Sequence, residues 1–243
     1  MKKILLFFIL FGLGSGVIAQ KQVNVSASSS GKIDCKTLMT FKKGFKTQMT
    51  SYDKKDQVTG IVNQEVIEVD TEGADVVATC KMSKDEKYSR ERSDEFTTKL
   101  RCHNGGIVMN FRDMMGSRTS FAGMKNMEMK IAGDDVEIPY QLTVGQALPE
   151  NTMTMQMLMN GNPVMTMSTT MKDRVVEKKE TITTNAGTFE CYKITYKIVN
   201  STGMGEQYSY AIWMDKGLTI KSATYDEDGK AINYTLLTKL EKP

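Results

Sequence analysis

The sequence has little of what most catalytic and metal sites require. Its 243 residues include one histidine, His103, and four cysteines that form no Cys-x-x-Cys pair. A structural zinc site needs four closely grouped nitrogen or sulfur ligands, and this composition does not favour such a site. The sequence also contains no Gly-x-Ser-x-Gly, phosphate-loop or dinucleotide-binding pattern. We therefore expect a protein that is not an enzyme and that has no cofactor.

His103 is the one residue through which a histidine-dependent nucleophile could be activated. It directly follows Cys102, in a segment whose composition is typical of a strand. Neighbours in a strand point to opposite faces, so Cys102 and His103 do not form a nucleophile–base pair. We expect His103 to be a surface residue in a turn.

Neither sign of charge is in excess, since the chain has 32 lysines and arginines and 29 aspartates and glutamates. Proteins that bind nucleic acid usually carry a basic excess gathered into a patch, so a nucleic-acid partner is not expected. Long apolar runs are also absent after the first twenty residues. A membrane-spanning helix needs about 20 such residues, and we expect no transmembrane segment.

The first twenty residues are MKKILLFFILFGLGSGVIAQ. Lys2 and Lys3 precede a short apolar run, and Val17-Ile18-Ala19 forms a small-residue cleavage site, as in a secretory signal peptide. No cysteine closely follows the apolar run, so we expect no lipoprotein anchor. Residues 1–19 are therefore predicted to be a signal peptide, and the mature protein to be exported to the periplasm or the cell exterior.

The cysteines are candidates for disulfide bonds because an exported protein meets an oxidising compartment. They lie far apart in the sequence, at Cys35, Cys80, Cys102 and Cys191. Their even number and wide spacing favour one or two disulfides, with buried thiols as the alternative for unpaired residues. The sequence leaves open which cysteines pair.

Most of the chain after the signal peptide is predicted to form β-strands separated by turns. Segment 60–70 is rich in β-branched residues, and turn signals recur at Asn104-Gly105, Asn185-Ala186-Gly187 and Asp215-Lys216-Gly217. This spacing is typical of antiparallel sheets rather than β-α-β units. We expect an all-β, mainly antiparallel fold, either a curved barrel-like sheet or a sandwich, with few short helices. The best helix candidate is 111–127.

The region 132–151 contains Pro139 and Pro149 together with glycine-marked bends. We expect it to be a connection between two β-rich halves rather than a flexible linker. The predicted organisation is a signal peptide over 1–19, an N-terminal half over 20–131 and a C-terminal half over 132–243, with the halves packed as one unit.

Methionine is abundant, with 19 residues, and its spacing is regular in NTMTMQMLMNGNPVMTMSTTM, residues 151–171. Six methionines alternate with other residues on both sides of a turn-like NGNP segment: Met153, Met155, Met157, Met159, Met165 and Met167. In an extended strand, the first four must share one face, opposite Thr152, Thr154 and Gln156. The position of the last two depends on the loop. A three- or five-residue loop places all six on one face, and a four-residue loop separates them.

Three interpretations of these methionines remain open. As core residues, each would contribute about 1.5–3 kcal/mol of burial. As a ligand surface, their flexible side chains would adapt to an apolar small molecule or envelope component. As soft thioether ligands, they would select Cu(I) or Ag(I), with this candidate set: Met153, Met155, Met157, Met165 and Met167. The leading hypothesis is a non-catalytic envelope or secreted protein that binds an apolar, lipid-like ligand or partner. The Cu(I) site and a purely structural protein with a methionine core are the alternatives.

Other candidate sites have simpler explanations. Trp213 could form a ligand platform with nearby tyrosines, but a tryptophan in such a strand is also a usual core residue. Asp134 and Asp135 precede a strand and are typical of turns. The DEDG segment at 226–229 resembles part of a calcium loop but lacks the remaining ligands, and we expect a solvated turn.

The C-terminal half also carries a family resemblance. The segments VVEKKETITTNAGTFECYKITY and DKGLTIKSATYDEDGKAINYTLLTKL resemble the TapB-like domain-of-unknown-function family of secreted bacterial proteins. Members carry a motif of the form E-x-(I/V)-T-T-P-A-G-T-F-x-C-Y-K, in which Asn185 here replaces the usual proline. The resemblance covers roughly residues 130 to 240, with a looser match upstream. It implies an exported β-rich protein and no known activity or catalytic residue.

Overall fold

The computed structural model describes residues 34–85, 95–103, 105–109, 127–201 and 208–243. The predicted signal peptide over 1–19 lies outside these ranges. The predicted helix over 111–127 also lies outside them, except for Met127, which begins a strand.

The described residues form strands and two short 3-10 helices, and they contain no α-helix. The elements are η1 (Cys35–Thr37), η2 (Met39–Phe41), β1 (Lys46–Asp53), β2 (Val58–Glu72), β3 (Asp75–Lys84), β4 (Phe96–His103), β5 (Gly106–Met109), β6 (Met127–Gly133), β7 (Val136–Pro139), β8 (Asn151–Met159), β9 (Asn162–Thr184), β10 (Gly187–Asn200), β11 (Tyr208–Asp215), β12 (Leu218–Tyr225) and β13 (Ala231–Glu241). This composition confirms the predicted all-β fold.

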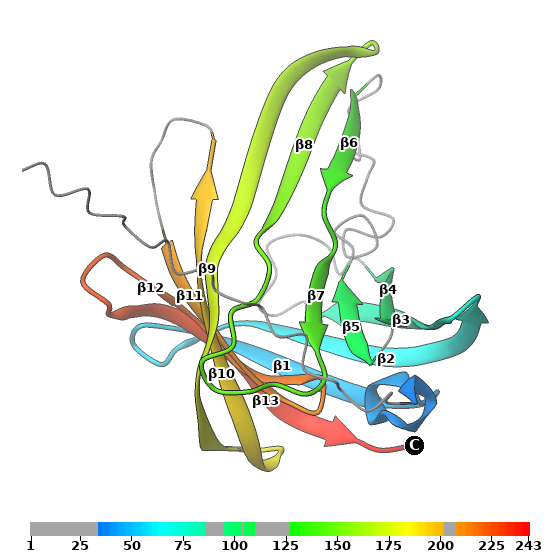
Figure 1. Ribbon diagram of the computed structural model, residues 1–243, viewed down its shortest axis with the longest axis vertical. Coiled ribbons are helices and arrows are strands. Elements are labelled where there is room, and N and C mark those ends of the chain that lie inside the picture. Colours follow the sequence, from blue (N-terminus) through cyan, green and yellow to red (C-terminus); the bar gives the residue numbers. More distant parts are fainter. Residues whose placement is uncertain (1–33, 86–94, 104, 110–126, 202–207) are drawn as a thin grey trace, which may run out of the picture.

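All of the strands belong to one 13-stranded sheet with the order β6-β8-β9-β10-β11-β12-β13-β1-β2-β3-β4-β5-β7. The edge strands β6 and β7 are separated in the chain by only Asp134 and Asp135. The two ends of the sheet must therefore lie close together, so the sheet curves round on itself (Figure 1). The curved alternative predicted from the sequence is thus the observed one, and strands from both predicted halves share the sheet.

Two-residue turns connect several of the hairpins. Asp215 pairs with Leu218, which leaves Lys216 and Gly217 to form the turn, at φ values of 47° and 79°. Positive φ at both central positions is the geometry of a type I′ turn, which suits the twist of paired strands. The turn signal at 215–217 therefore identified this hairpin correctly.

Side chains of β7 and of the connection that follows it form part of one core cluster. Val136, Ile138, Leu142 and Leu148 are buried against side chains of β9, β10 and β11. The same segment pairs with β9 through the isolated bridge between Ala147 and Val175. These residues are thus held in the core, and the predicted division of the chain into two halves stays a prediction.

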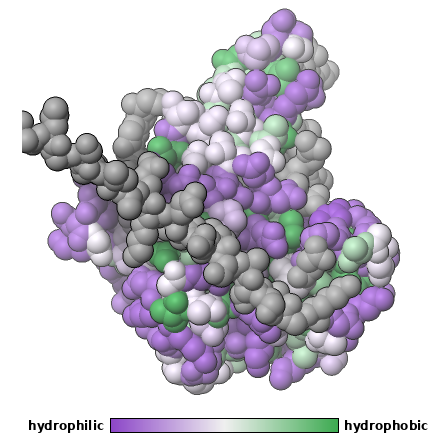
Figure 2. Space-filling model, viewed as in Figure 1, coloured by the Kyte–Doolittle hydropathy of each residue, from purple (hydrophilic) through white to green (hydrophobic). Residues whose placement is uncertain are grey.

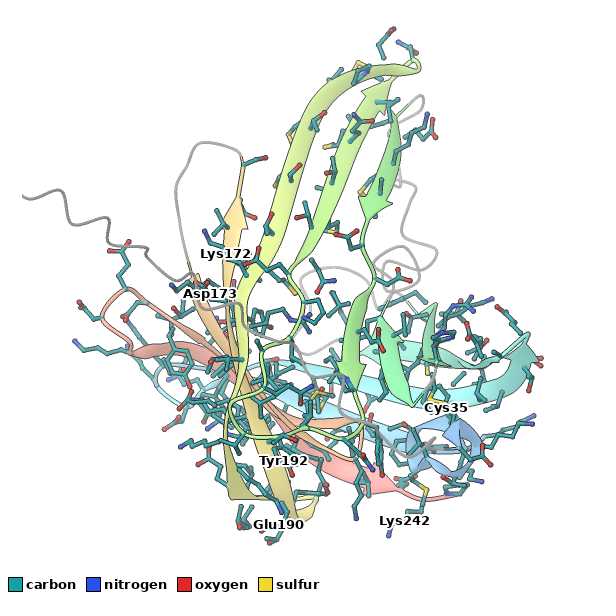
Figure 3. All side chains as sticks on the ribbon, in the orientation of Figure 1. Cys35, Lys172, Asp173, Glu190, Tyr192 and Lys242 are labelled. Atoms are coloured by element: carbon teal, nitrogen blue, oxygen red, sulfur yellow. A yellow bond between two sulfur atoms is a disulfide. The ribbon has the colours of Figure 1, made fainter. Side chains whose placement is uncertain are left out.

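One end of the sheet projects from the rest of the molecule (Figure 1). We call this part the arm: it consists of β6, β8 and residues 162–171 of β9. At its base, Asp173 has a φ of 55° and forms an ion pair with Lys197 of β10, with 2.8 Å between Oδ2 and Nζ. Figure 3 labels Lys172 and Asp173 where β9 rises from the body. The irregular backbone thus lies where the arm leaves the body.

Candidate functional site

The arm carries the six methionines of the sequence pattern on one face. Met155 lies directly opposite Met167, and Met157 lies directly opposite Met165. Residues directly opposite each other in an antiparallel pair project from the same face of the sheet. Strand β6 extends this face, because Met127, Met129 and Ile131 lie opposite Met159, Met157 and Met155. We call the resulting surface the methionine face: Met127, Met129, Ile131, Met153, Met155, Met157, Met159, Met165 and Met167.

A β-bulge determines this arrangement. Met159 pairs with Asn162 across the two-residue turn Asn160-Gly161, a loop length that the sequence alternatives did not include. An even loop in a regular hairpin would place Met165 on the opposite face from Met157. Val164 is instead left unpaired between the pairs Leu158–Pro163 and Met157–Met165. The extra residue restores the alternation and brings all six methionines to one face.

The methionine face is not a sealed core. Met159 and Met165 are 47% and 45% exposed, and Met153, Met155, Met157 and Met167 are half-buried. Only Met129 and Ile131 on β6 are buried. None of the six methionines is fully buried, and their interpretation as a hydrophobic core stays a prediction.

The opposite face of the arm is mainly polar, although Leu158 also lies on it and is buried. Thr152 and Thr170 are hydrogen-bonded with 3.1 Å between their hydroxyl oxygens, and Thr154 and Ser168 with 3.0 Å. By alternation, Glu128 and Lys130 of β6 also lie on this side, so the charged residues of the strand avoid the methionine face. In the space-filling view, purple residues and some green ones cover the tip of the arm, and pale residues of intermediate hydropathy extend below them (Figure 2).

Arg174 fixes the base of the arm, and sequence reasoning did not identify it. Its side chain is buried and donates hydrogen bonds from Nη1 to Oδ1 of Asn151 at 2.5 Å and to the carbonyl of Pro149 at 2.6 Å. A third bond joins Nη2 to the carbonyl of Glu137 at 3.2 Å. Burial lowers the pKa of Arg174 from its usual value. The guanidinium thus connects β9 to β7 and to the start of β8.

The cysteines divide into one disulfide and two thiols. Cys35 and Cys102 form a disulfide, which joins η1 to β4. Cys80 and Cys191 are free and buried, so the second disulfide that the sequence allowed does not form. Burial raises the pKa of Cys80 to about 11 and that of Cys191 to about 12. Both thiols are therefore protonated at neutral pH, and a protonated, buried thiol is a poor nucleophile and a poor metal ligand.

His103 lies at the end of β4 rather than in a turn, so this part of the sequence prediction is wrong. Its Nδ1 is hydrogen-bonded to Oδ1 of Asp75, the first residue of β3, and its side chain is 45% exposed. Asp75 also lies 3.7 Å from Nη1 of Arg101. Cys102 on the same strand is in the disulfide and supplies no nucleophile.

Trp213 is not part of the methionine face. It lies on β11, is 4% exposed and packs in a core cluster with Cys191, Ile220 and Leu237. Its Nε1 donates a hydrogen bond to Oε1 of Glu180 at 2.6 Å. The structure thus gives Trp213 the core role that the sequence allowed as the alternative to a ligand platform.

Of the remaining candidate segments, 226–229 forms the predicted turn, whereas Asp134 and Asp135 link β6 to β7 without a turn, so the turn prediction is wrong for these two residues. Asp134 Oδ2 accepts a hydrogen bond from the backbone of Thr152, and Asp226 Oδ1 accepts one from the backbone of Lys230. In the ranges that the structure covers, no group of three or more histidine, cysteine or acidic side chains could hold a metal ion. Those ranges also contain no helix long and apolar enough to cross a membrane.

Two described hollows lie elsewhere on the molecule. One, of about 210 Å³, lies between Tyr140 and the β11–β12 turn, and includes Glu190 and Tyr192, which Figure 3 labels on β10. The other, of about 330 Å³, is a polar trough across β13, β1, β2 and β3. Neither of these two hollows includes a residue of the methionine face. The methionine face is therefore separate from both of these hollows.

These features define an all-β protein built on one curved antiparallel sheet with a projecting arm. The chain belongs to the DUF3108-like family, whose model matches residues 42–237. The resemblance to a TapB-like family stays a prediction. No sequence among the curated proteins matches this chain significantly.

Two solved structures share the fold. A Bacteroides fragilis protein, named as exported and with a YmcC-like fold, is 19% identical and superposes with a TM-score of 0.61, covering 83% of this chain and 97% of its own. A Parabacteroides distasonis protein, named as a lipoprotein, is 20% identical with a TM-score of 0.60, covering 83% of this chain and 96% of its own. At these identities, the likeness shows the fold alone.

Proposed function

We propose that this is an exported, non-catalytic envelope protein whose methionine face binds the acyl chains of lipid at a membrane surface. The observation that carries the proposal is the uncharged methionine face, on which Met159 and Met165 are almost half exposed. Each half-exposed methionine can gain of the order of 1 kcal/mol on further burial, so a contact shared by several is worth several kcal/mol.

Export is supported by three independent features. The first twenty residues have the form of a signal peptide, and the Cys35–Cys102 disulfide suits an oxidising compartment. The two proteins of the same fold are named as exported and as a lipoprotein. A binding role rather than catalysis is supported by the single histidine and by the buried, protonated thiols Cys80 and Cys191.

Sedimentation with phospholipid vesicles tests lipid binding. We expect the mature protein to sediment with vesicles, and Met157→Asp to remain in the supernatant because a carboxylate would have to be desolvated at the centre of the face. Thr166→Asp is the matched control, since Thr166 is exposed on the opposite face of the same hairpin and should not affect sedimentation.

The pair Met155→Leu and Met157→Leu should retain binding, since leucine keeps an apolar side chain of similar volume. The proposal is wrong if the wild-type protein does not sediment with vesicles. It is also wrong if Met157→Asp and Thr166→Asp sediment equally.

A further inference from the structure

The apolar character of this face does not by itself explain why its residues are methionine. Strand positions favour β-branched and aromatic residues, and valine or isoleucine would give an apolar face with better strand propensity. The face instead repeats methionine across three strands, in the pairs Met129–Met157, Met157–Met165 and Met155–Met167. Methionine differs from these residues in its flexible, unbranched chain and in its soft, polarisable sulfur, and of these two features the sulfur is the one that can bind a metal.

The register places four of these side chains at the corners of a compact rectangle. Met155 and Met157 are two residues apart on β8, and Met167 and Met165 lie opposite them on β9. Opposite Cβ atoms are about 5 Å apart, and residues two positions apart on a strand are about 7 Å apart. The thioether sulfur is two bonds beyond Cβ on a flexible chain, so three or four sulfurs can converge above the centre of the rectangle.

The surroundings suit a soft monovalent cation. The residues of the methionine face provide no carboxylate or imidazole, which are the groups that would attract hard or borderline cations. Met155, Met157 and Met167 are half-buried and Met165 is exposed, so a metal ion can reach the sulfurs without opening the fold. On the opposite face, the hydroxyl pairs Thr154–Ser168 and Thr152–Thr170 link the same two strands next to the site, on the side of Met155 and Met167.

We infer that Met155, Met157, Met165 and Met167 form a thioether site for Cu(I), with Ag(I) as a chemical equivalent. Thioethers need no deprotonation to bind a metal and select Cu(I) over harder cations. The site is on the same face as the proposed lipid contact but does not depend on it, because the metal requires sulfur and the lipid requires only an apolar surface.

The test is competition for Cu(I) between the mature protein and a chromophoric Cu(I) chelator, with ascorbate present to keep the metal reduced. We expect one Cu(I) to be bound per chain. The double variant Met155→Leu/Met167→Leu should raise the dissociation constant by roughly 100-fold or more, because it removes two of the directly coordinating atoms. X-ray absorption of the loaded wild-type protein should show sulfur as the only ligand atom.

Matched substitutions outside the rectangle give the control. Met49→Leu/Met82→Leu removes two thioethers from β1 and β3 and should leave Cu(I) affinity unchanged. Thermal unfolding of both double variants shows whether each is folded. Cu(I) binding that persists in Met155→Leu/Met167→Leu would belong to other groups, such as the free thiols, and would overturn the inference. Absence of Cu(I) and Ag(I) binding by the wild-type protein would also overturn it.

The outcomes for lipid and metal are separable. Sedimentation of the metal-free wild-type protein measures the lipid contact, and Cu(I) affinity of Met155→Leu/Met167→Leu measures the metal site. Met157→Asp should lose vesicle binding. A protein that binds Cu(I) without binding vesicles supports the thioether site alone, and the reverse result supports the lipid contact alone.

Discussion

Single residues determine how the arm is held on the body, and Arg174 is the clearest case. The guanidinium has no carboxylate partner among the described contacts and bonds instead to Asn151 and to two backbone carbonyls. Burying a charge is costly unless its hydrogen-bonding groups are satisfied. This role could not be predicted from the sequence, because Arg174 follows Lys172 and Asp173, and consecutive charged residues are typical of a solvated surface.

We predict that Arg174→Leu lowers the free energy of unfolding by about 3 kcal/mol. The substitution leaves Oδ1 of Asn151 without this donor in a buried setting and removes the part-buried bonds to the carbonyls of Pro149 and Glu137, and each unsatisfied buried group costs about 1–3 kcal/mol. Urea denaturation measures the change. Lys197→Leu is the control, because its ion pair with Asp173 is solvent-exposed and contributes little to stability. Equal losses in the two variants would contradict this account of Arg174.

At the scale of elements, the hairpins were more predictable than the register within them. The turns at Lys216-Gly217 and after Thr184 followed from local residue preferences. The face occupied by Met165 and Met167 could not be predicted in this way, because it depends on the unpaired Val164. Pro163 was the one available signal, since proline in a strand is tolerated at edges and bulges.

The pairing of β6 with β8 depends on Gly133. This residue has a φ of 148°, and a Cβ built there would lie 2.3 Å from the carbonyl oxygen of Thr152 and 2.7 Å from the Cα of Met153. Both neighbours are backbone atoms, so no side-chain movement can relieve the clash. We predict that Gly133→Ala separates the end of β6 from β8 and costs at least about 2 kcal/mol.

Amide hydrogen exchange tests this prediction because it reports each strand separately. Protection of the β6 amides should fall in Gly133→Ala, and protection in β1 and β2 should not change. Gly60→Ala in β2 is the matched control, since the nearest atom to its added Cβ is the Cβ of Ser51 at 4.0 Å. Unchanged protection of β6 would show that the edge of the arm tolerates the side chain.

At the scale of the whole molecule, the order of the strands could not be derived from the sequence. The last strand, β13, pairs with the first, β1, so that Lys46 lies opposite Glu241. Local turn preferences identify which strands form hairpins but carry no information about pairings between distant segments. The class of fold was nevertheless correct, because alternation and turn spacing report an antiparallel sheet whatever its order.

A second long-range link joins the N-terminal segment to the sheet. The Cys35–Cys102 disulfide connects residues 67 apart in sequence, and Leu38 and Phe41 beside it are buried in the same core cluster as Cys80 and Ile107. The two 3-10 helices that carry these residues contribute no strand hydrogen bonds to the sheet. The covalent bond and the buried side chains are therefore the main features that hold this segment in place.

We predict that Cys35→Ala/Cys102→Ala lowers the free energy of unfolding by about 2–5 kcal/mol, mainly because a closed loop of this length restricts the unfolded chain. Thermal unfolding with and without reductant provides the measurement. Reductant should lower the melting temperature of the wild-type protein and leave that of the double variant unchanged, because Cys80 and Cys191 form no disulfide. Thiol labelling of the denatured protein should confirm that reduction occurred. A wild-type melting temperature that does not respond to complete reduction would mean that packing of Leu38 and Phe41 alone holds the N-terminal segment.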